Sequence, residues 1–227
     1  MQNQNTELVF VNYESKYYEQ LKVTMAECYT DLADSHITYS EIELLSQLYP
    51  YGQILCFLNG ELIGAIFSRI VSFEKYSKPH KGEDTYDINT FVEDSEKGES
   101  VYAMELWVKP AYQQLKVAKQ LHKKLEEVTF KNNFQCLLAV SRITNYNKYQ
   151  KEMDAVTYAH KVKNRELADP VLGFHLSNGV VLGDAFAGYI TDDIKSAGFG
   201  IFIYLPNPNH NAQQPIYLER FQNAKLL

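Results

Sequence analysis

The chain has 227 residues and a formal net charge of −6 at pH 7, with 45% hydrophobic and 22% charged residues. This composition is ordinary for a globular protein, and the negative charge argues against non-specific nucleic-acid binding, which needs a basic surface. The sequence shows no apolar run near the roughly 18 residues of a membrane span, and the polar start MQNQNTE is unlike a signal peptide. Three distant cysteines and six scattered histidines predict reduced thiols and no metal site. We therefore expect a cytoplasmic protein without membrane or nucleic-acid partners.

The first 73 residues predict a strand, two helices and a hairpin. Residues 8–11 are a short apolar strand, and residues 15–32 carry apolar side chains at helical spacing. A second helix is expected to start at Ser40, with Glu43 completing a capping box. Residues 53–58 and 62–73 then predict two antiparallel strands, because Asn59-Gly60 between them is a strong two-residue hairpin signal.

Residues 74–100 differ from their surroundings because they are rich in acidic side chains and show little apolar periodicity. The simpler interpretation is a solvated external loop, which limited proteolysis should cut first. The alternative is a lid whose acidity favours a cationic amine.

The centre of the chain predicts a strand that turns into a helix. Residues 101–108 are apolar, aromatic and β-branched, and Pro110 ends the strand. The next apolar residues recur at spacings of 4, 4 and 3, as on one face of a helix: Val117, Leu121, Leu125 and Val128. A helix that starts here leaves unpaired N–H groups at its N-terminus, which predicts an anion site suited to phosphate.

The last part of the chain predicts two more helices and three strands. Residues 134–140 are an apolar strand, and a helix over residues 155–167 is stopped by Asp169-Pro170. A short helix over residues 171–177 should end at Asn178-Gly179. Residues 180–186 and 200–205 are the closing strands, and no role is assigned to residues 206–227.

Residues 108–118, VKPAYQQLKVA, resemble the acyl-CoA-binding motif of the GNAT superfamily of N-acetyltransferases. In that motif a strand ending in V-x-P precedes Q/R-x-x-G-x-G/A at the start of a helix. Gln113 and Ala118 fit it, whereas Lys116 stands where the family usually has Gly. The resemblance implies an α/β (mixed α+β) fold with a central mixed, mostly antiparallel sheet of about seven strands flanked by helices. Residues 1–227 would form one domain, with its core at about 7–205.

Three further segments are similar to the acetyltransferase domain found fused to carbon–nitrogen hydrolases (nitrilase-like enzymes). They are YPYGQ from Tyr49, SRITNY from Ser141 and DPVLGFHLSNG from Asp169. We expect this chain to carry the acyltransferase part without the hydrolase.

The resemblance implies acetyl-CoA, or another acyl-CoA, as the donor substrate and an amine as the acceptor. The backbone of Leu106, Trp107 and Val108 would pair with the pantetheine arm, and Asn145 would contact that arm or its thiol. The pyrophosphate would lie at the turn formed by Gln113, Gln114, Leu115, Lys116, Val117, Ala118 and Lys119.

Glu105 is the first candidate for catalysis, because desolvation in an apolar strand raises a carboxylate pKa toward that of a base useful near pH 7. A structural salt bridge is the alternative for it. The resemblance places His175 where the family usually has the Tyr that protonates the leaving thiolate, although a coenzyme contact or a structural role would also fit. Tyr146 is the second candidate for this proton donor.

Three functions remain open. The first is an N-acetyltransferase that acts on a small amine or a protein amino group. The second is a binding module that has lost turnover, motivated by Lys116 and His175. The third is an N-acyl synthase that takes its donor from an acyl-carrier protein, for which Lys119, Lys123, Lys124 and Lys131 would supply a basic docking surface. The acceptor, the acyl length and the oligomeric state are left open, with a homodimer among the options.

Overall fold

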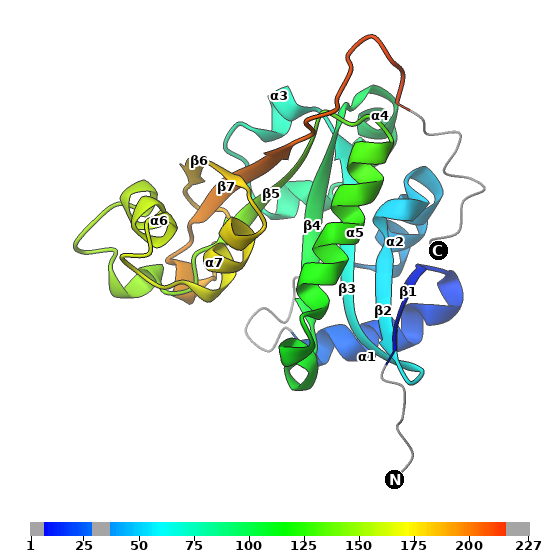
Figure 1. Ribbon diagram of the computed structural model, residues 1–227, viewed down its shortest axis with the longest axis horizontal. Helices are drawn as coiled ribbons and strands as arrows, with labels where there is room; N and C mark the ends of the chain where they lie inside the picture. The colour runs from blue at the N-terminus through cyan, green and yellow to red at the C-terminus, as the bar shows by residue number, and fades with distance from the viewer. Residues whose placement is uncertain (1–6, 29–36, 217–227) are drawn as a thin grey trace.

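A computed structural model describes residues 7–28 and 37–216 of the protein, which form a seven-stranded sheet flanked by helices (Figure 1). The strand order is β1-β2-β3-β4-β5-β7-β6, and every neighbouring pair is antiparallel except β4 and β5, which run parallel. The prediction of a mixed, mostly antiparallel sheet of about seven strands is confirmed. The strands are β1 (Leu8–Asn12), β2 (Ile54–Leu58), β3 (Glu61–Val71), β4 (Ser100–Val108), β5 (Cys136–Arg142), β6 (Val181–Phe186) and β7 (Gly200–Pro206).

Helices cover both faces of the sheet. The α-helices are α1 (Tyr18–Cys28), α2 (Tyr39–Leu48), α3 (Phe73–Tyr76), α4 (Ile88–Lys97), α5 (Val117–Lys131), α6 (Ala155–Lys163) and α7 (Pro170–Ser177). Short 3₁₀ turns are η1 (Ser15–Tyr17), η2 (Pro50–Gly52), η3 (Glu83–Tyr86), η4 (Pro110–Leu115), η5 (Tyr146–Lys148) and η6 (Ile194–Ser196). Helix α5 lies along β4 and packs Val117, Leu121 and Leu125 against one face, while α1, α2 and α4 pack against the other (Figure 1).

The N-terminal part matches the predicted element types but differs at one cap. Helix α2 is capped by Thr38 rather than Ser40, because the Thr38 hydroxyl accepts from the Glu41 N–H and the Glu41 carboxylate accepts from the Thr38 N–H. Glu43 does not complete the box and instead accepts a 2.8 Å hydrogen bond from the Tyr13 hydroxyl. Residues 29–32 of the predicted first helix lie outside the described residues.

Both predicted turn signals are confirmed. Asn59 and Gly60 take positive φ angles of 52° and 83°, as a two-residue hairpin of the primed type requires. Gly179, which follows α7, has φ 83° and ends that helix. The start of the tail is also ordered, because the Asn207 side chain donates to the carbonyls of Phe130 and Phe134 and so ties the tail to the end of α5.

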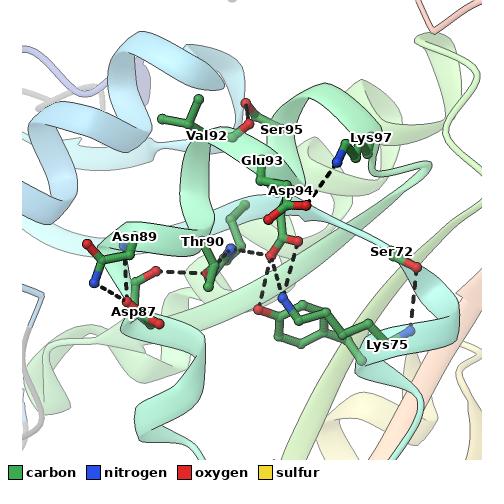
Figure 2. A network of polar contacts seen from close by, with 12 residues as sticks. Ser72, Lys75, Asp87, Asn89, Thr90, Val92, Glu93, Asp94, Ser95 and Lys97 are labelled. Atoms are coloured by element: carbon green, nitrogen blue, oxygen red, sulfur yellow. Dashed lines mark hydrogen bonds and ion pairs between the residues drawn. The ribbon is translucent and has the colours of Figure 1, made fainter.

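The prediction of an external loop over residues 74–100 is wrong. This insertion between β3 and β4 folds into η3 and α4, together with most of α3. The buried residues of α4 are Phe91 and Asp94, so its inward face is half polar and gives little apolar periodicity. Asp94 forms an ion pair with the buried Arg69 of β3 at 2.5 Å and accepts a hydrogen bond from the Tyr76 hydroxyl. It also accepts from Lys75, as Figure 2 shows. The buried Arg69 of β3 therefore anchors the insertion, and no sequence pattern within the insertion predicts this ion pair.

Candidate active site

The candidate site lies where the two parallel strands of the sheet separate. β4 and β5 pair only at Val101–Leu137 and Tyr102–Leu138, although both strands continue for several residues beyond these pairs. From there the strands diverge (Figure 1), and a cavity of about 550 Å³ opens between them. Residues 103–106 of β4 and 137–140 of β5 form much of its wall on the sheet, together with residues of β3 and β7.

A β-bulge in β4 directs Glu105 to one side of this cavity. In the pairing with β3, Glu105 lies opposite Phe67 and Ala103 opposite Ser68, so Met104 is the extra residue. The bulge interrupts the alternation of side chains along β4. Ala103 and Leu106 pack toward α5, whereas Met104 and Trp107 pack with the core on the opposite face. Glu105 lies on the same face of the sheet as α4, where its carboxylate accepts a hydrogen bond from the Tyr86 hydroxyl.

Glu105 is buried, with 6% of its surface exposed. Its Oε1 accepts a 2.7 Å hydrogen bond from the Tyr86 hydroxyl, and its Oε2 is buried without a partner among the described residues. Burial raises the pKa of Glu105 to about 7, and Glu41 adds to this, while the hydrogen bond from Tyr86 and the proximity of the Ile37 backbone lower it. At neutral pH this carboxyl group can therefore both accept and release a proton. Its role as the base remains a prediction.

The edge of β4 that faces the cavity offers backbone groups to a ligand. The Lys109 N–H donates to the Ile63 carbonyl of β3 at 2.8 Å. Antiparallel alternation then directs the N–H and C=O of Trp107 toward β3 and those of Leu106 and Val108 toward the open edge. Of the three residues expected to pair with a pantetheine arm, Leu106 and Val108 have this orientation. Trp107 does not, because its backbone belongs to the β3–β4 ladder.

The predicted phosphate turn has the expected strand–turn–helix form. Its 3₁₀ turn η4 follows β4, and α5 starts at Val117. Lys116, at the usual Gly position, takes the left-handed conformation with φ 57° and ψ 28°, which Gly adopts without steric cost. The side chains of Gln113, Gln114, Lys116 and Lys119 are exposed. The first N–H groups of α5 include those of Val117, Ala118 and Lys119, and Leu115 ends the turn before them.

A pair of histidines lines the α5 and α7 side of the cavity. His122 of α5 and His175 of α7 have ring centroids 6.4 Å apart, and the Nδ1 atom of each is buried without a partner among the described residues. Burial lowers the pKa of both imidazoles, and for His175 the proximity of His122 lowers it further. Burial therefore favours the neutral form of both rings at pH 7, and the role of His175 as proton donor remains a prediction.

The structure does not bring Tyr146 and Asn145 into the cavity. The Tyr146 hydroxyl donates to the Met153 carbonyl at 3.1 Å, and its ring packs against Tyr158 and Phe199. The Asn145 side-chain amide donates to the Ala168 carbonyl, which ties this turn to the segment before α7. These contacts account for both side chains in the structure, and the roles expected of them at the donor remain predictions. The lining residues that the sequence reasoning missed include Tyr86, His122 and Tyr189.

Among residues 7–28 and 37–216, no helix is long and apolar enough to cross a membrane. The same ranges hold no group of three or more His, Cys, Asp or Glu side chains placed to bind a metal ion.

Residues 18–153 match the Acetyltransferase (GNAT) family. The chain is 27% identical over 209 residues to the "Probable hydrolase YhcX" of Bacillus subtilis, covering 91% of this chain but only 40% of that protein's length. It is 29% identical over 202 residues to the "Uncharacterized N-acetyltransferase YkwB" of the same organism, covering 88% of this chain and 89% of that one.

Solved structures share the fold at lower identity. The loading GNATL domain of CurA from Lyngbya majuscula is 18% identical, with a TM-score of 0.75, over 88% of this chain and 98% of that one. The GphF GNAT-like decarboxylase in complex with isobutyryl-CoA is 20% identical, with a TM-score of 0.69, over 87% of this chain and 98% of that one. The family match covers more than half of the sequence and includes β4, the turn and α5. The chain therefore belongs to the GNAT acetyltransferase family.

Proposed function

We propose that the protein is an N-acyltransferase that moves an acetyl or other acyl group from a CoA thioester to a primary amine. The observation that carries this proposal is the position of Glu105. Its carboxyl group is buried beside the cavity between β4 and β5, next to the open edge of β4. A proton acceptor and a strand edge for the donor are thus available at the same place.

The donor would bind along β4 and the start of α5. The outward backbone groups of Leu106 and Val108 would hydrogen-bond the pantetheine amides, much as an added strand does. The N-terminus of α5 would hold the pyrophosphate, and the exposed Lys116 and Lys119 would add positive charge. Support for an acyl-CoA donor comes from the family and from the GphF neighbour, which was solved with isobutyryl-CoA.

The reaction would need an acceptor for the ammonium proton. Glu105 would take that proton from the ammonium group of the acceptor, and the free amine would attack the thioester carbonyl carbon. The C–S bond would then break and the nitrogen would lose its second proton to the CoA thiolate or to solvent, giving an amide and CoA. A thiolate with a pKa of about 8.5 leaves without strong help from an acid. His175 would remain a neutral imidazole beside the donor, and its part in protonating the thiolate is a proposal that His175→Ala tests.

The two alternative functions make different demands on the same surface. A binding module would take up acyl-CoA without releasing CoA. A synthase fed by an acyl-carrier protein would need a basic docking face on α5. Two lysines of that face already have partners within the protein, because Lys123 pairs with Glu127 at 3.7 Å and Lys124 lies over the Phe10 ring at 4.8 Å. We therefore favour CoA as the carrier of the acyl group.

The narrower likeness to domains fused to carbon–nitrogen hydrolases remains a proposal. It is supported by the relative named a probable hydrolase, of which this chain spans 40%. Nothing in the proposed transfer reaction depends on it.

The test combines binding and turnover on the purified chain. Calorimetry with acetyl-CoA and with CoA measures donor binding, and release of free thiol from acetyl-CoA in the presence of an amine measures transfer. Binding together with amine-dependent thiol release supports the proposal. Binding without release indicates the binding module, and the absence of binding by either compound contradicts an acyl-CoA function.

A further inference from the structure

On the face of the sheet opposite α5, two segments distant in sequence meet over the cavity. Residues 80–86 belong to the insertion between β3 and β4, and residues 186–190 begin the connection from β6 to β7. The Gly82 N–H donates to the Tyr189 carbonyl at 2.7 Å, and both residues line the cavity. We call this contact between residues 80–86 and 186–190 the clasp.

Side chains fix the clasp to the central strand. The Tyr102 hydroxyl of β4 lies 3.1 Å from His80 Nε2 and 3.0 Å from the Tyr189 hydroxyl. The His80 ring also packs edge-on against Phe186, with centroids 5.2 Å apart. Tyr102 is fully buried and Tyr189 is 8% exposed. One β4 side chain therefore contacts both halves of the clasp, through His80 and Tyr189.

The two halves of the clasp are in direct contact. A Cβ atom added at Gly82 would lie 3.1 Å from the Tyr189 carbonyl oxygen and 3.4 Å from Ile190 Cγ1. An extended polypeptide needs about 4.8 Å between its backbone and that of each neighbouring strand. The hydrogen-bonded clasp leaves no such space, so a peptide could not lie between its halves without breaking it.

The charge on this side of the cavity is negative. Glu41 and Glu83 line the cavity together with Glu105, and Glu105 Oε2 is buried without a partner among the described residues. The cation on the lining, Arg142, forms a two-point ion pair with Asp193 at 2.7 Å. A buried carboxylate oxygen that lacks a partner favours a ligand that supplies a cationic N–H donor.

We propose that the acceptor is a small cationic primary amine with an apolar body, and that the clasp excludes amino groups carried by a polypeptide. This inference rests on the proposed acyltransferase function and adds the class of acceptor. The rest of the lining suits an apolar body, because it includes Met104, Val140 and Ile190.

The experiment compares acceptors that carry the same reactive group. Release of CoA from saturating acetyl-CoA is measured with propylamine, hexylamine and phenethylamine, with phenylalanine, with a heptapeptide bearing a free N-terminus and with an N-acetylated peptide containing one lysine. Phenethylamine and phenylalanine differ only by a carboxylate, which the acidic lining should repel. We expect kcat/KM for the best small amine to exceed that for phenylalanine and for both peptides by about tenfold or more, which corresponds to 1.4 kcal/mol.

A matched pair of glycine variants tests the clasp. Gly82→Ala adds a methyl group against Tyr189 and Ile190, whereas Gly173→Ala of α7 adds one that meets no atom within 4 Å. Gly82→Ala should raise KM for phenethylamine and leave acetyl-CoA affinity unchanged, and Gly173→Ala should change neither. Tyr189→Phe, which removes the hydroxyl bonded to Tyr102, should also raise KM for phenethylamine.

The outcomes distinguish failure of the inference about the acceptor from failure of the proposed acyltransferase function. Peptides used as well as phenethylamine, or phenylalanine preferred to phenethylamine, would overturn the inference while leaving the acyltransferase function intact. Acetyl-CoA binding without turnover of any amine would overturn it as well. If calorimetry instead detects no binding of acetyl-CoA, the proposed acyltransferase function on which the inference rests is contradicted.

Discussion

Tyr86 donates its hydroxyl hydrogen to Oε1 of Glu105 at 2.7 Å and so joins the inserted segment to the central strand at the cavity. Tyr86 ends η3, and Glu105 follows the bulge in β4. The two residues are 19 positions apart in sequence. Because this hydrogen bond stabilises the charged carboxylate, the insertion offsets part of the rise that burial causes in the pKa of the candidate base.

Tyr86→Phe should therefore raise the pKa of Glu105 above its value of about 7. Removing a hydrogen bond to a charged group shifts the balance toward the protonated form, so less of the base is ionised at pH 7. We expect kcat/KM to fall by about tenfold at pH 7 and to recover at pH 9, where Glu105 is ionised in both proteins. Parallel pH–rate profiles of the wild type and the variant measure this. If kcat/KM falls equally at pH 7 and at pH 9, Tyr86 positions the substrate and does not act through the pKa of Glu105.

Lys116→Gly should keep or improve acetyl-CoA affinity. Lys116 holds a left-handed backbone conformation that costs a non-Gly residue about 1–2 kcal/mol, and Gly also lets a phosphate approach the backbone. Calorimetry gives the affinity, and Lys116→Val serves as a contrast, since a β-branched residue is poorly tolerated at positive φ. A tenfold loss of affinity in the Gly variant would identify the Lys116 side chain as a phosphate ligand and refute our account of the turn.

Asp94→Ala should strongly destabilise the fold. It removes the carboxylate paired with the buried Arg69, and an uncompensated buried charge costs about 3–5 kcal/mol. For a chain of this size the loss corresponds to a Tm lower by roughly 6–20 °C. Glu93→Ala is the control, because Glu93 is exposed and pairs only across the surface with Lys97. A Tm shift no larger than that of the control would show that the Arg69–Asp94 pair does not anchor the insertion.

The histidine pair should make stability depend on pH below about 6.5. Burial lowers the pKa of His122 and His175 in the folded protein, whereas in the unfolded chain each has a pKa near 6.5. As the pH falls, the unfolded chain binds protons that the folded chain does not, so stability is lost. His122→Gln and His175→Gln should each reduce this slope by about 1.4 kcal/mol per pH unit.

Urea unfolding between pH 7 and pH 4.5 measures these slopes, with His160→Gln, an exposed position on α6, as the control. Slopes identical to the wild type in both cavity variants would show that the two imidazoles titrate normally in the folded protein.

The sequence was most informative where local chemistry decides the structure. Asn59-Gly60 specifies its turn through backbone preference, and the apolar stripe of α5 specifies the helix. Glu105 was recognised as a buried carboxylate because its neighbours along the strand are apolar. These features need no knowledge of distant contacts.

The features that the sequence did not reveal depend on partners far along the chain. Helix α4 buries Asp94 against an arginine 25 residues earlier, so its inward face does not look apolar. His122 follows Leu121 on α5 and appears polar until α7 brings His175 close to it. Asn145 and Tyr146 were placed by position in a family pattern, yet their side chains turn to Ala168 and Met153.

The most direct test of the account is the turnover of Glu105→Gln compared with its acetyl-CoA affinity. If Glu105 is the base, the variant should bind acetyl-CoA as tightly as the wild type and lose ~10²–10⁴-fold in kcat, the usual contribution of general acid–base catalysis. The wild-type rate, corrected for titration of the acceptor amine, should rise with pH to a plateau above about 7, where Glu105 is ionised, and this rise should be absent from the variant. A Glu105→Gln protein with wild-type kcat would contradict the central claim.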